Sequence, residues 1–298
     1  MQTDVHGILL LDKPLGLSSA GAVARAKYLL GARKAGHTGS LDPLASGLLP
    51  ICFGEATKFG AQMLDVDKTY AVIARLGERT ASADLESPVI ERRALPALST
   101  ADLAAALAEF PRAYDQIPPM HSAIKQDGRP LYEYARAGET RERAARRITI
   151  HELKVRAWQA PELHFEVRCS KGAYIRVLAE DIAARLGTIA HLTGLRRTAV
   201  APFDAGRLWS FADLEALTLQ ARRELLLPVD AAVGAPRLDL PASQVAALRQ
   251  GRTLKVTLGD PGTVRIYAEG LGFLGLGELS VDGRLVPSRL IAAAVNRA

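Results

Sequence analysis

Cysteine, aromatic side chains and long apolar runs are scarce in this chain of 298 residues. Its two cysteines, Cys52 and Cys169, are too few and too far apart for a disulfide framework, and its six histidines show no ligand spacing, so we expect no metal. No run approaches the ~18 apolar residues of a membrane helix. The first residues also lack the basic and apolar regions of a signal peptide. We therefore expect a cytoplasmic protein that makes no membrane contact.

Apolar side chains and basic charge are what the chain does have. Hydrophobic residues make up 48% of it, enough for one large and one small domain with a sizeable core. Lysine and arginine exceed aspartate and glutamate by 38 to 32, a net charge of +6. This excess favours a polyanionic partner, and the basic residues gather in residues 125–147.

The hydrophobic pattern predicts alternating strands and helices. Expected strands cover residues 7–11, 68–76, 148–157 and 163–169, with a turn into a further strand at 192–198. Expected helices begin near residues 19, 100, 175 and 211, three of them at serine caps. Residues 77–98 are polar and broken, so we expect a loop there, and 111–147 resemble a basic insertion containing aromatic residues. A Pro-rich boundary at 228–241 precedes a small β-rich tail with a short helix at 243–250.

Residues 36–58 contain the most distinctive local pattern. Glycines at 36, 39, 47 and 54 surround Asp42, which Pro43 biases toward an extended backbone. So many helix and strand breakers predict a shaped loop that can approach a ligand closely. On these residues alone, however, an aspartate before a proline is most often a turn or cap residue.

The full string of motifs resembles the signature of the tRNA pseudouridine-55 synthases. The elements that carry the resemblance within this string are His37-Thr38-Gly39, Leu41-Asp42-Pro43, Gly47-Leu48-Leu49-Pro50 and Gly54-Glu55-Ala56-Thr57-Lys58. Further matching elements lie elsewhere in residues 7–235, and they are Asp12-Lys13-Pro14, Lys68-Thr69-Tyr70, Leu131-Tyr132-Glu133, Tyr174-Ile175-Arg176 and Leu195-Arg196-Arg197-Thr198. The chain departs from the usual pattern at His121, where a tyrosine is expected, and at Val200-Ala201, where a glycine is frequent.

The resemblance implies an α+β fold in which a mixed, mainly antiparallel sheet forms the catalytic domain. This domain would cover residues 1–235, with an RNA-gripping insertion at about 111–147. Residues 236–298 would form a small β-rich RNA-binding module of PUA type. The implied activity is isomerisation of uridine 55 in the T loop of tRNA to pseudouridine, without a cofactor, by a protein that we expect to be a monomer.

The same resemblance implies roles for individual side chains. Asp42 would be the nucleophile and Arg176 its ionic partner, since a nearby guanidinium favours the charged form of a carboxylate. Tyr70 would lie against the flipped uracil and act in catalysis, and Tyr174 would line the same pocket. The remaining substrate contacts would come from His37, Leu195, Lys13 and Lys58. His37 would occupy the space vacated by the flipped nucleotide, Leu195 would touch the base, and the two lysines would meet phosphates.

Each of these residues also has a plain structural interpretation. An arginine at position 176 is more commonly a surface residue of a helix, Leu195 is typical of a core, and Lys13 and Lys58 are typical of solvated or structural lysines. Two other functions remain open at this point. One is a non-catalytic protein that binds or helps to fold tRNA on the same scaffold, and the other is a related synthase that depends on a guide RNA.

Overall fold

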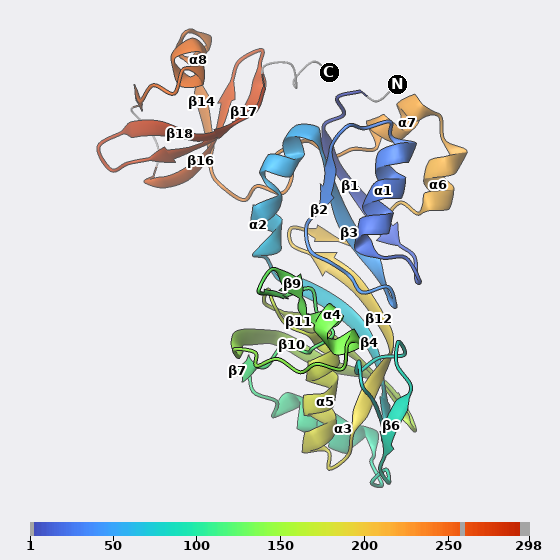
Figure 1. Ribbon diagram of the computed structural model, residues 1–298. Helices are drawn as coiled ribbons and strands as arrows, with labels where there is room; N and C mark the ends of the chain where they lie inside the picture. The colour runs from blue at the N-terminus through green and yellow to red at the C-terminus, as the bar shows by residue number, and fades with distance from the viewer. Residues whose placement is uncertain (1–2, 257–259, 293–298) are drawn as a thin grey trace.

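Two sheets organise the computed structural model, which describes residues 3–256 and 260–292 (Figure 1). A nine-stranded sheet belongs to the larger part of the chain, and a five-stranded sheet begins at Arg237. All pairings in the larger sheet are antiparallel except that between β3 (Ala45–Phe53) and β12 (Ala190–Val200). The predicted α+β class with a mixed, mainly antiparallel sheet is confirmed.

Seven strands of the large sheet run in the order β1-β3-β12-β4-β11-β10-β7, and two short strands flank them. The other bounds are β1 Gly7–Lys13, β2 Ala35–His37, β4 Lys68–Leu76, β7 Ala113–Gln116, β10 Arg146–Gln159, β11 Glu162–Cys169 and β13 Phe203–Asp204. Because β12 lies between β3 and β4, it brings the segment after His37 close to the start of β4. This neighbourhood is the part of the sheet that carries the site.

The helices of this part are short and lie beside the sheet (Figure 1). They are α1 Ser19–Leu29, the 3-10 helix η1 Gly54–Lys58, α2 Gly60–Leu64, α3 Thr100–Ala108, α4 Leu131–Arg136, α5 Ile175–Arg185, α6 Phe211–Ala216 and α7 Leu219–Glu224. Ser18 caps α1, and Ser99 and Ser210 form capping boxes with Asp102 and Asp213. These caps satisfy backbone donors that the first turn leaves unpaired, and they confirm the predicted helix starts.

Alternation along β1 places successive side chains on opposite faces of the sheet. Leu9 and Leu11 join the main core, together with buried residues of α1, α3, α5 and α6. Ile8 points the other way, into a second cluster that includes Met63 and Phe273. The second cluster therefore joins the back of the large sheet to the C-terminal sheet.

The five-stranded C-terminal sheet has the order β14-β16-β17-β18-β15. Its elements are β14 Arg237–Leu240, α8 Ala242–Arg249, β15 Leu254–Lys255, β16 Gly262–Ala268, β17 Gly272–Leu279 and β18 Arg284–Leu290. The expected short helix and strands of the tail are present. The predicted boundary at residues 235/236 falls just before β14, and Figure 1 shows this sheet beside α2 and η1, away from the lower end of the large sheet.

Three expectations about local structure are wrong. Residues 36–58 are not one shaped loop, because 45–53 form β3 and only 38–44 lie between strands. Residues 77–98 contain a hairpin of β5 (Glu78–Thr80) and β6 (Val89–Arg92). The turn expected at 192–198 lies inside the continuous strand β12. The insertion, for which no elements were expected, contains α4 and a small hairpin of β8 (Lys125–Gln126) and β9 (Arg129–Pro130).

Candidate active site

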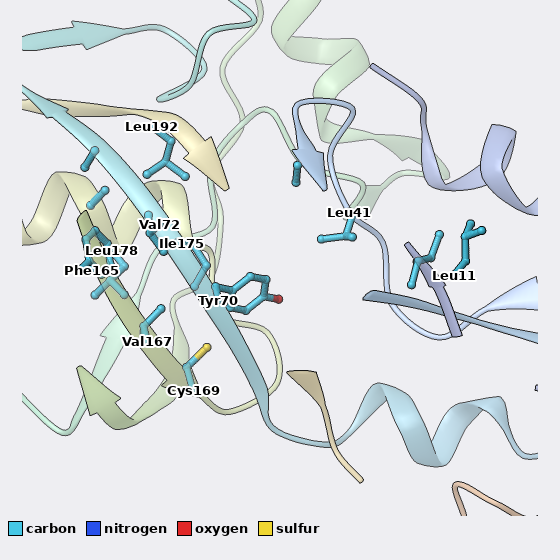
Figure 2. Packing of buried hydrophobic residues seen from close by; sticks show 14 of the residues in the cluster. Leu11, Leu41, Tyr70, Val72, Phe165, Val167, Cys169, Ile175, Leu178 and Leu192 are labelled. Carbon is cyan, nitrogen blue, oxygen red and sulfur yellow. The ribbon is translucent and has the colours of Figure 1, made fainter. Parts of the chain in front are cut away.

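The segment that carries Asp42 is fixed from inside the protein. The Ser19 hydroxyl donates to the Leu41 carbonyl at 2.9 Å and accepts from the Leu41 amide at 2.8 Å. Leu41 itself is buried, and Figure 2 shows it opposite the end of the packed residues near Tyr70. The neighbouring Asp42 side chain is 45% exposed. Because Leu41 is fixed by Ser19, the backbone of the adjacent Asp42 is held in one position while its carboxylate remains accessible to solvent.

Arg176 pairs with this carboxylate from the first turn of α5. Its Nη2 lies 3.1 Å from Asp42 Oδ2, and only 5% of its side chain is exposed. Two main-chain carbonyls hold the guanidinium, because Nη1 donates to Ser82 O at 2.9 Å and Nη2 to His121 O at 2.7 Å. The unusual His121 does not disturb this arrangement, since the bond uses its main chain. An arginine held at several points can orient a carboxylate rather than merely neutralise it.

Asp84 is a member of the site that the sequence did not reveal. Its Oδ2 lies 3.7 Å from Arg176 Nε, and its Oδ1 accepts from the Glu86 amide at 2.9 Å. The carboxylate is buried in the turn between β5 and β6, where Ala83 has a φ of +60°. Because residues 77–98 were expected to be an unstructured connection, nothing in their pattern distinguished Asp84 from an ordinary turn aspartate.

A cleft of about 520 Å³ opens beside the ion pair. Its lining includes Asp42, Tyr70, Tyr174, Arg176 and Leu195, five of the residues predicted for the site. The volume lies within the range of sites that enclose a small organic group. The structure therefore brings together, in one hollow, residues that are separated by up to about 150 positions in the chain.

Both tyrosines of the cleft keep their protons at neutral pH. Burial raises the pKa of Tyr70, and the charge of Arg197 opposes part of that rise. Burial also raises the pKa of Tyr174. Figure 2 shows the Tyr70 ring at the end of the core, with its hydroxyl directed toward the side on which Leu41 lies. Each ring can therefore offer an apolar face and a hydrogen-bond donor to a bound group.

Three other predicted residues lie outside the lining of this cleft. His37 is half-buried on β2, where burial and the nearby Arg197 lower its pKa, so it is neutral at pH 7. Lys13 is fully buried, and its Nζ donates to the carbonyls of Pro14 and Leu17 at 2.9 and 2.7 Å. Its donors are therefore directed into the protein, and a phosphate contact by Lys13 stays a prediction.

Lys58 lies where the two parts of the chain meet. Its Nζ is 2.6 Å from Glu55 Oε2 and donates to the Leu290 carbonyl at 3.0 Å. Arg289 donates in return to the Lys58 carbonyl at 2.6 Å. These bonds join η1 to β18. A phosphate contact by the partly exposed Lys58 ammonium stays a prediction.

Within residues 3–256 and 260–292, no group of three or more His, Cys, Asp or Glu side chains could hold a metal ion. In the same part of the chain, no helix is long and apolar enough to cross a membrane.

The fold and the cleft together define a class of enzyme. A half-exposed carboxylate, held by a buried arginine in a cleft that two protonated tyrosines also line, is an arrangement suited to nucleophilic catalysis.

Comparison with known proteins identifies the family. Residues 27–175 match the N-terminal domain of the TruB family pseudouridylate synthases. Residues 176–234 match the C-terminal domain of tRNA pseudouridylate synthase B, and 236–291 match the C-terminal model of pseudouridine synthase II TruB. The chain belongs to the TruB family of pseudouridylate synthases.

Relatives with curated names match nearly the whole chain. One from Chromohalobacter salexigens is 47% identical over 98% of this chain and 96% of its own length, and one from Aromatoleum aromaticum is 50% identical over 97% and 93%. Both are named tRNA pseudouridine synthase B. Among solved structures, the crystal structure of a Cbf5-Nop10-Gar1 complex has a TM-score of 0.72 at 24% identity, covering 96% of this chain and 84% of that one. At this identity the likeness concerns the fold alone.

Proposed function

We propose that this protein converts uridine 55 in the T loop of tRNA to pseudouridine and that Asp42 is the nucleophile. The observation that carries the proposal is the ion pair of Asp42 with Arg176 at the cleft, 3.1 Å between Oδ2 and Nη2. The names of the relatives at 47% and 50% identity support the choice of tRNA as substrate.

The reaction is a rearrangement in which every atom is conserved. The bond between C1′ of the ribose and N1 of uracil breaks, a bond between C1′ and C5 forms, C5 loses a proton and N1 gains one. No electron is exchanged with a partner, so the overall change requires no redox cofactor. The Asp42 carboxylate attacks either C1′ of the sugar or C6 of the base, and both routes yield the same product.

The side chains around Asp42 support an extruded base. Tyr70 and Tyr174 would hold the uracil by stacking and hydrogen bonding, and Leu195 would contact it through apolar area. Extrusion of a base from its stack costs a few kcal/mol, so groups that hold the flipped state contribute to the rate. His37, neutral and half-buried just before the Asp42 segment, would fill the space that the nucleotide leaves.

The rest of the molecule would hold the RNA and fix its register. The insertion at 111–147 exposes basic side chains such as Lys125, and its His121 carbonyl touches Arg176 directly. With its own gripping segment, the protein would act without a guide RNA. A protein that only binds or folds tRNA would have no use for the Asp42–Arg176 pair, which distinguishes it from the enzyme. We further propose that the protein acts as a monomer on cytoplasmic tRNA.

Incubation of the purified protein alone with unmodified tRNA, followed by mapping of the isomerised position, tests this proposal. We expect one pseudouridine, at position 55. Product at another position would retain the reaction class and contradict the substrate site. Absence of product without an added guide RNA would favour the guide-dependent alternative.

A further inference from the structure

Within the part of the chain that the structure describes, Arg197 is the largest fully buried side chain, and the reaction as proposed assigns it no role. It lies within β12 and is 1% exposed. Its Nε donates to Leu48 O at 2.8 Å, its Nη2 to Gly39 O at 3.1 Å and its Nη1 to Ser40 O at 3.4 Å. Among the described residues, no carboxylate forms an ion pair with it. Besides these three main-chain bonds, the guanidinium interacts with the hydroxyl of Tyr70.

Burying a guanidinium without a counter-ion is costly unless its donors are satisfied. Here two of the three acceptors belong to the short segment that leads into Asp42. Gly39 has a φ of +122°, a conformation that other residues avoid, so this segment has a backbone that needs external support. Arg197 supplies that support through the main chain of Gly39 and Ser40, whereas Arg176 holds the Asp42 side chain.

The approach of β12 to the Asp42 segment is itself closely fitted. Arg197 pairs with Gly47 in the parallel register of β12 and β3, and a Cβ on Gly47 would lie 2.3 Å from the Arg197 carbonyl. Only glycine allows this distance. Because the two strands cannot separate without losing their pairing, the Arg197 guanidinium remains within reach of Gly39 and Ser40.

Arg197 also reaches the other side of the cleft. It is the cross-strand partner of Tyr70 on β4, and its charge acts on the Tyr70 hydroxyl. Both residues line the same cleft as Asp42. The Arg197 side chain therefore contacts two different parts of the site. One is the main chain of Gly39 and Ser40, just before the nucleophile, and the other is Tyr70, which is proposed to hold the base.

We propose that Arg197 is a positioning residue of the isomerisation, which sets the distance between the Asp42 carboxylate and a uridine held against Tyr70. The inference rests on the proposed roles of Asp42 and Tyr70. Arg197 acts through the carbonyls of Gly39 and Ser40 rather than on the substrate. Small displacements of reacting groups reduce rates strongly, by about 10²-fold for 1 Å.

The test compares Arg197→Lys and Arg197→Met with Arg196→Met as the matched control. Arg196 is the adjacent residue of β12, and its guanidinium pairs with Asp12 at 2.8 and 2.9 Å without contacting residues 39–42. Each variant is assayed for single-turnover formation of pseudouridine in tRNA, for tRNA affinity and for thermal unfolding. Release of tritium from C5 of labelled uridine reports the chemical conversion, because C5 loses its hydrogen in the reaction.

We expect Arg197→Met to lose about 10²-fold in single-turnover rate and Arg197→Lys roughly tenfold, because an ammonium cannot reproduce the planar fork of donors. Affinity for tRNA should change little in either variant, and Arg196→Met should retain the wild-type rate. If Arg197→Met is unfolded at the assay temperature, the single-turnover rate of Arg197→Lys alone tests the inference.

A folded Arg197→Lys with the wild-type rate would overturn the inference. Equal losses of rate and affinity would overturn it as well, because they would indicate general support of the RNA-binding surface. If the wild-type protein itself forms no pseudouridine in tRNA, it is the proposed function that fails, and this outcome is recognised before any variant is compared.

Discussion

The buried arginines that line the cleft and the more exposed arginines of the insertion bind different kinds of partner. Arg176 and Arg197 are buried and donate mainly to main-chain carbonyls. In the insertion, Arg129 and Arg141 pair with exposed glutamates and lie over the Tyr134 ring at 4.6 and 4.4 Å. Buried cations bound to the backbone fix geometry, whereas exposed pairs contribute little stability and exchange partners readily.

This difference separates two tasks that an RNA-modifying enzyme must perform. A fixed arrangement at the cleft suits the chemical step, which tolerates little displacement. The exposed arginine–glutamate pairs of the insertion suit a surface that binds RNA, because each arginine can exchange its glutamate for a phosphate. Substitutions in the cleft should therefore change the rate, and substitutions in the insertion should change affinity and its dependence on salt.

Among substitutions of the residues around Asp42, Arg176→Lys should reduce the rate most, because it removes the guanidinium that pairs with Asp42. A lysine cannot reach Ser82 O, His121 O and the Asp42 carboxylate together, so we expect a loss of about 10²-fold or more in single-turnover rate with nearly unchanged tRNA affinity. Arg185→Lys, at the other end of α5, is the matched control. Comparable losses in rate and affinity for Arg176→Lys would remove Arg176 from the chemical step.

Tyr70→Phe should have the next largest effect. It removes only the hydroxyl from a buried ring, so tRNA binding should persist while most of the turnover, about tenfold or more, is lost. Tyr28→Phe removes a hydroxyl from an 83% exposed ring on α1 and serves as control. Unaltered turnover in Tyr70→Phe would rule out a role for the hydroxyl.

Lys125→Ala tests whether the exposed cations of the insertion bind the RNA backbone. If this insertion lysine meets a phosphate, affinity for tRNA should fall a few-fold and the slope of log affinity against log salt should decrease by about one. The rate at saturating tRNA should not change. A wild-type affinity that is insensitive to salt would contradict the proposed grip of the insertion on the RNA backbone.

The smallest expected effect is a change in the free energy of unfolding with pH. Burial lowers the pKa of Lys13 from 10.5 to about 8, with the Asp42 charge opposing it, and burial lowers that of Lys68 to about 8 as well. Above pH 8 the unfolded chain holds protons on these lysines that the native protein has released, so the free energy of unfolding should rise with pH. Burial raises the pKa of the Cys52 and Cys169 thiols to about 12, which opposes this rise above pH 9.

Urea unfolding between about pH 8 and pH 9 measures this effect. Lys13→Met should show a smaller rise of the unfolding midpoint than the wild type. Lys125→Met is the control, since it retains both buried lysines, and the rise should persist in it. An unchanged pH dependence in Lys13→Met would show that its ammonium is not released in this range.

Local signals in the sequence predicted much of the fold. Ser99 and Ser210 each stand three residues before an aspartate, and both form the capping boxes that this spacing favours. The strand expected at 68–76 has those bounds in β4, because this segment is rich in the β-branched and aromatic residues that favour strands. The family motifs likewise identified Asp42, Tyr70, Tyr174, Arg176 and Leu195, which the structure gathers in one cleft.

Tertiary context decided what the sequence could not. Gly47 and Pro50 read as breakers, yet both lie inside β3, where Gly47 allows β12 to approach and neighbouring strands bury the backbone. Asp84 and Arg197 gain their importance from partners more than 90 positions away. Lys13 belongs to a recognisable motif, but only the packing around it reveals that its ammonium is turned inward.

The central claim is that the Asp42 carboxylate performs the attack. Its most direct test is Asp42→Asn, which keeps the size of the side chain and removes the nucleophilic charge. We predict that this variant binds tRNA with the wild-type affinity and forms no pseudouridine at position 55. Formation of pseudouridine at a rate near that of the wild type would contradict the account.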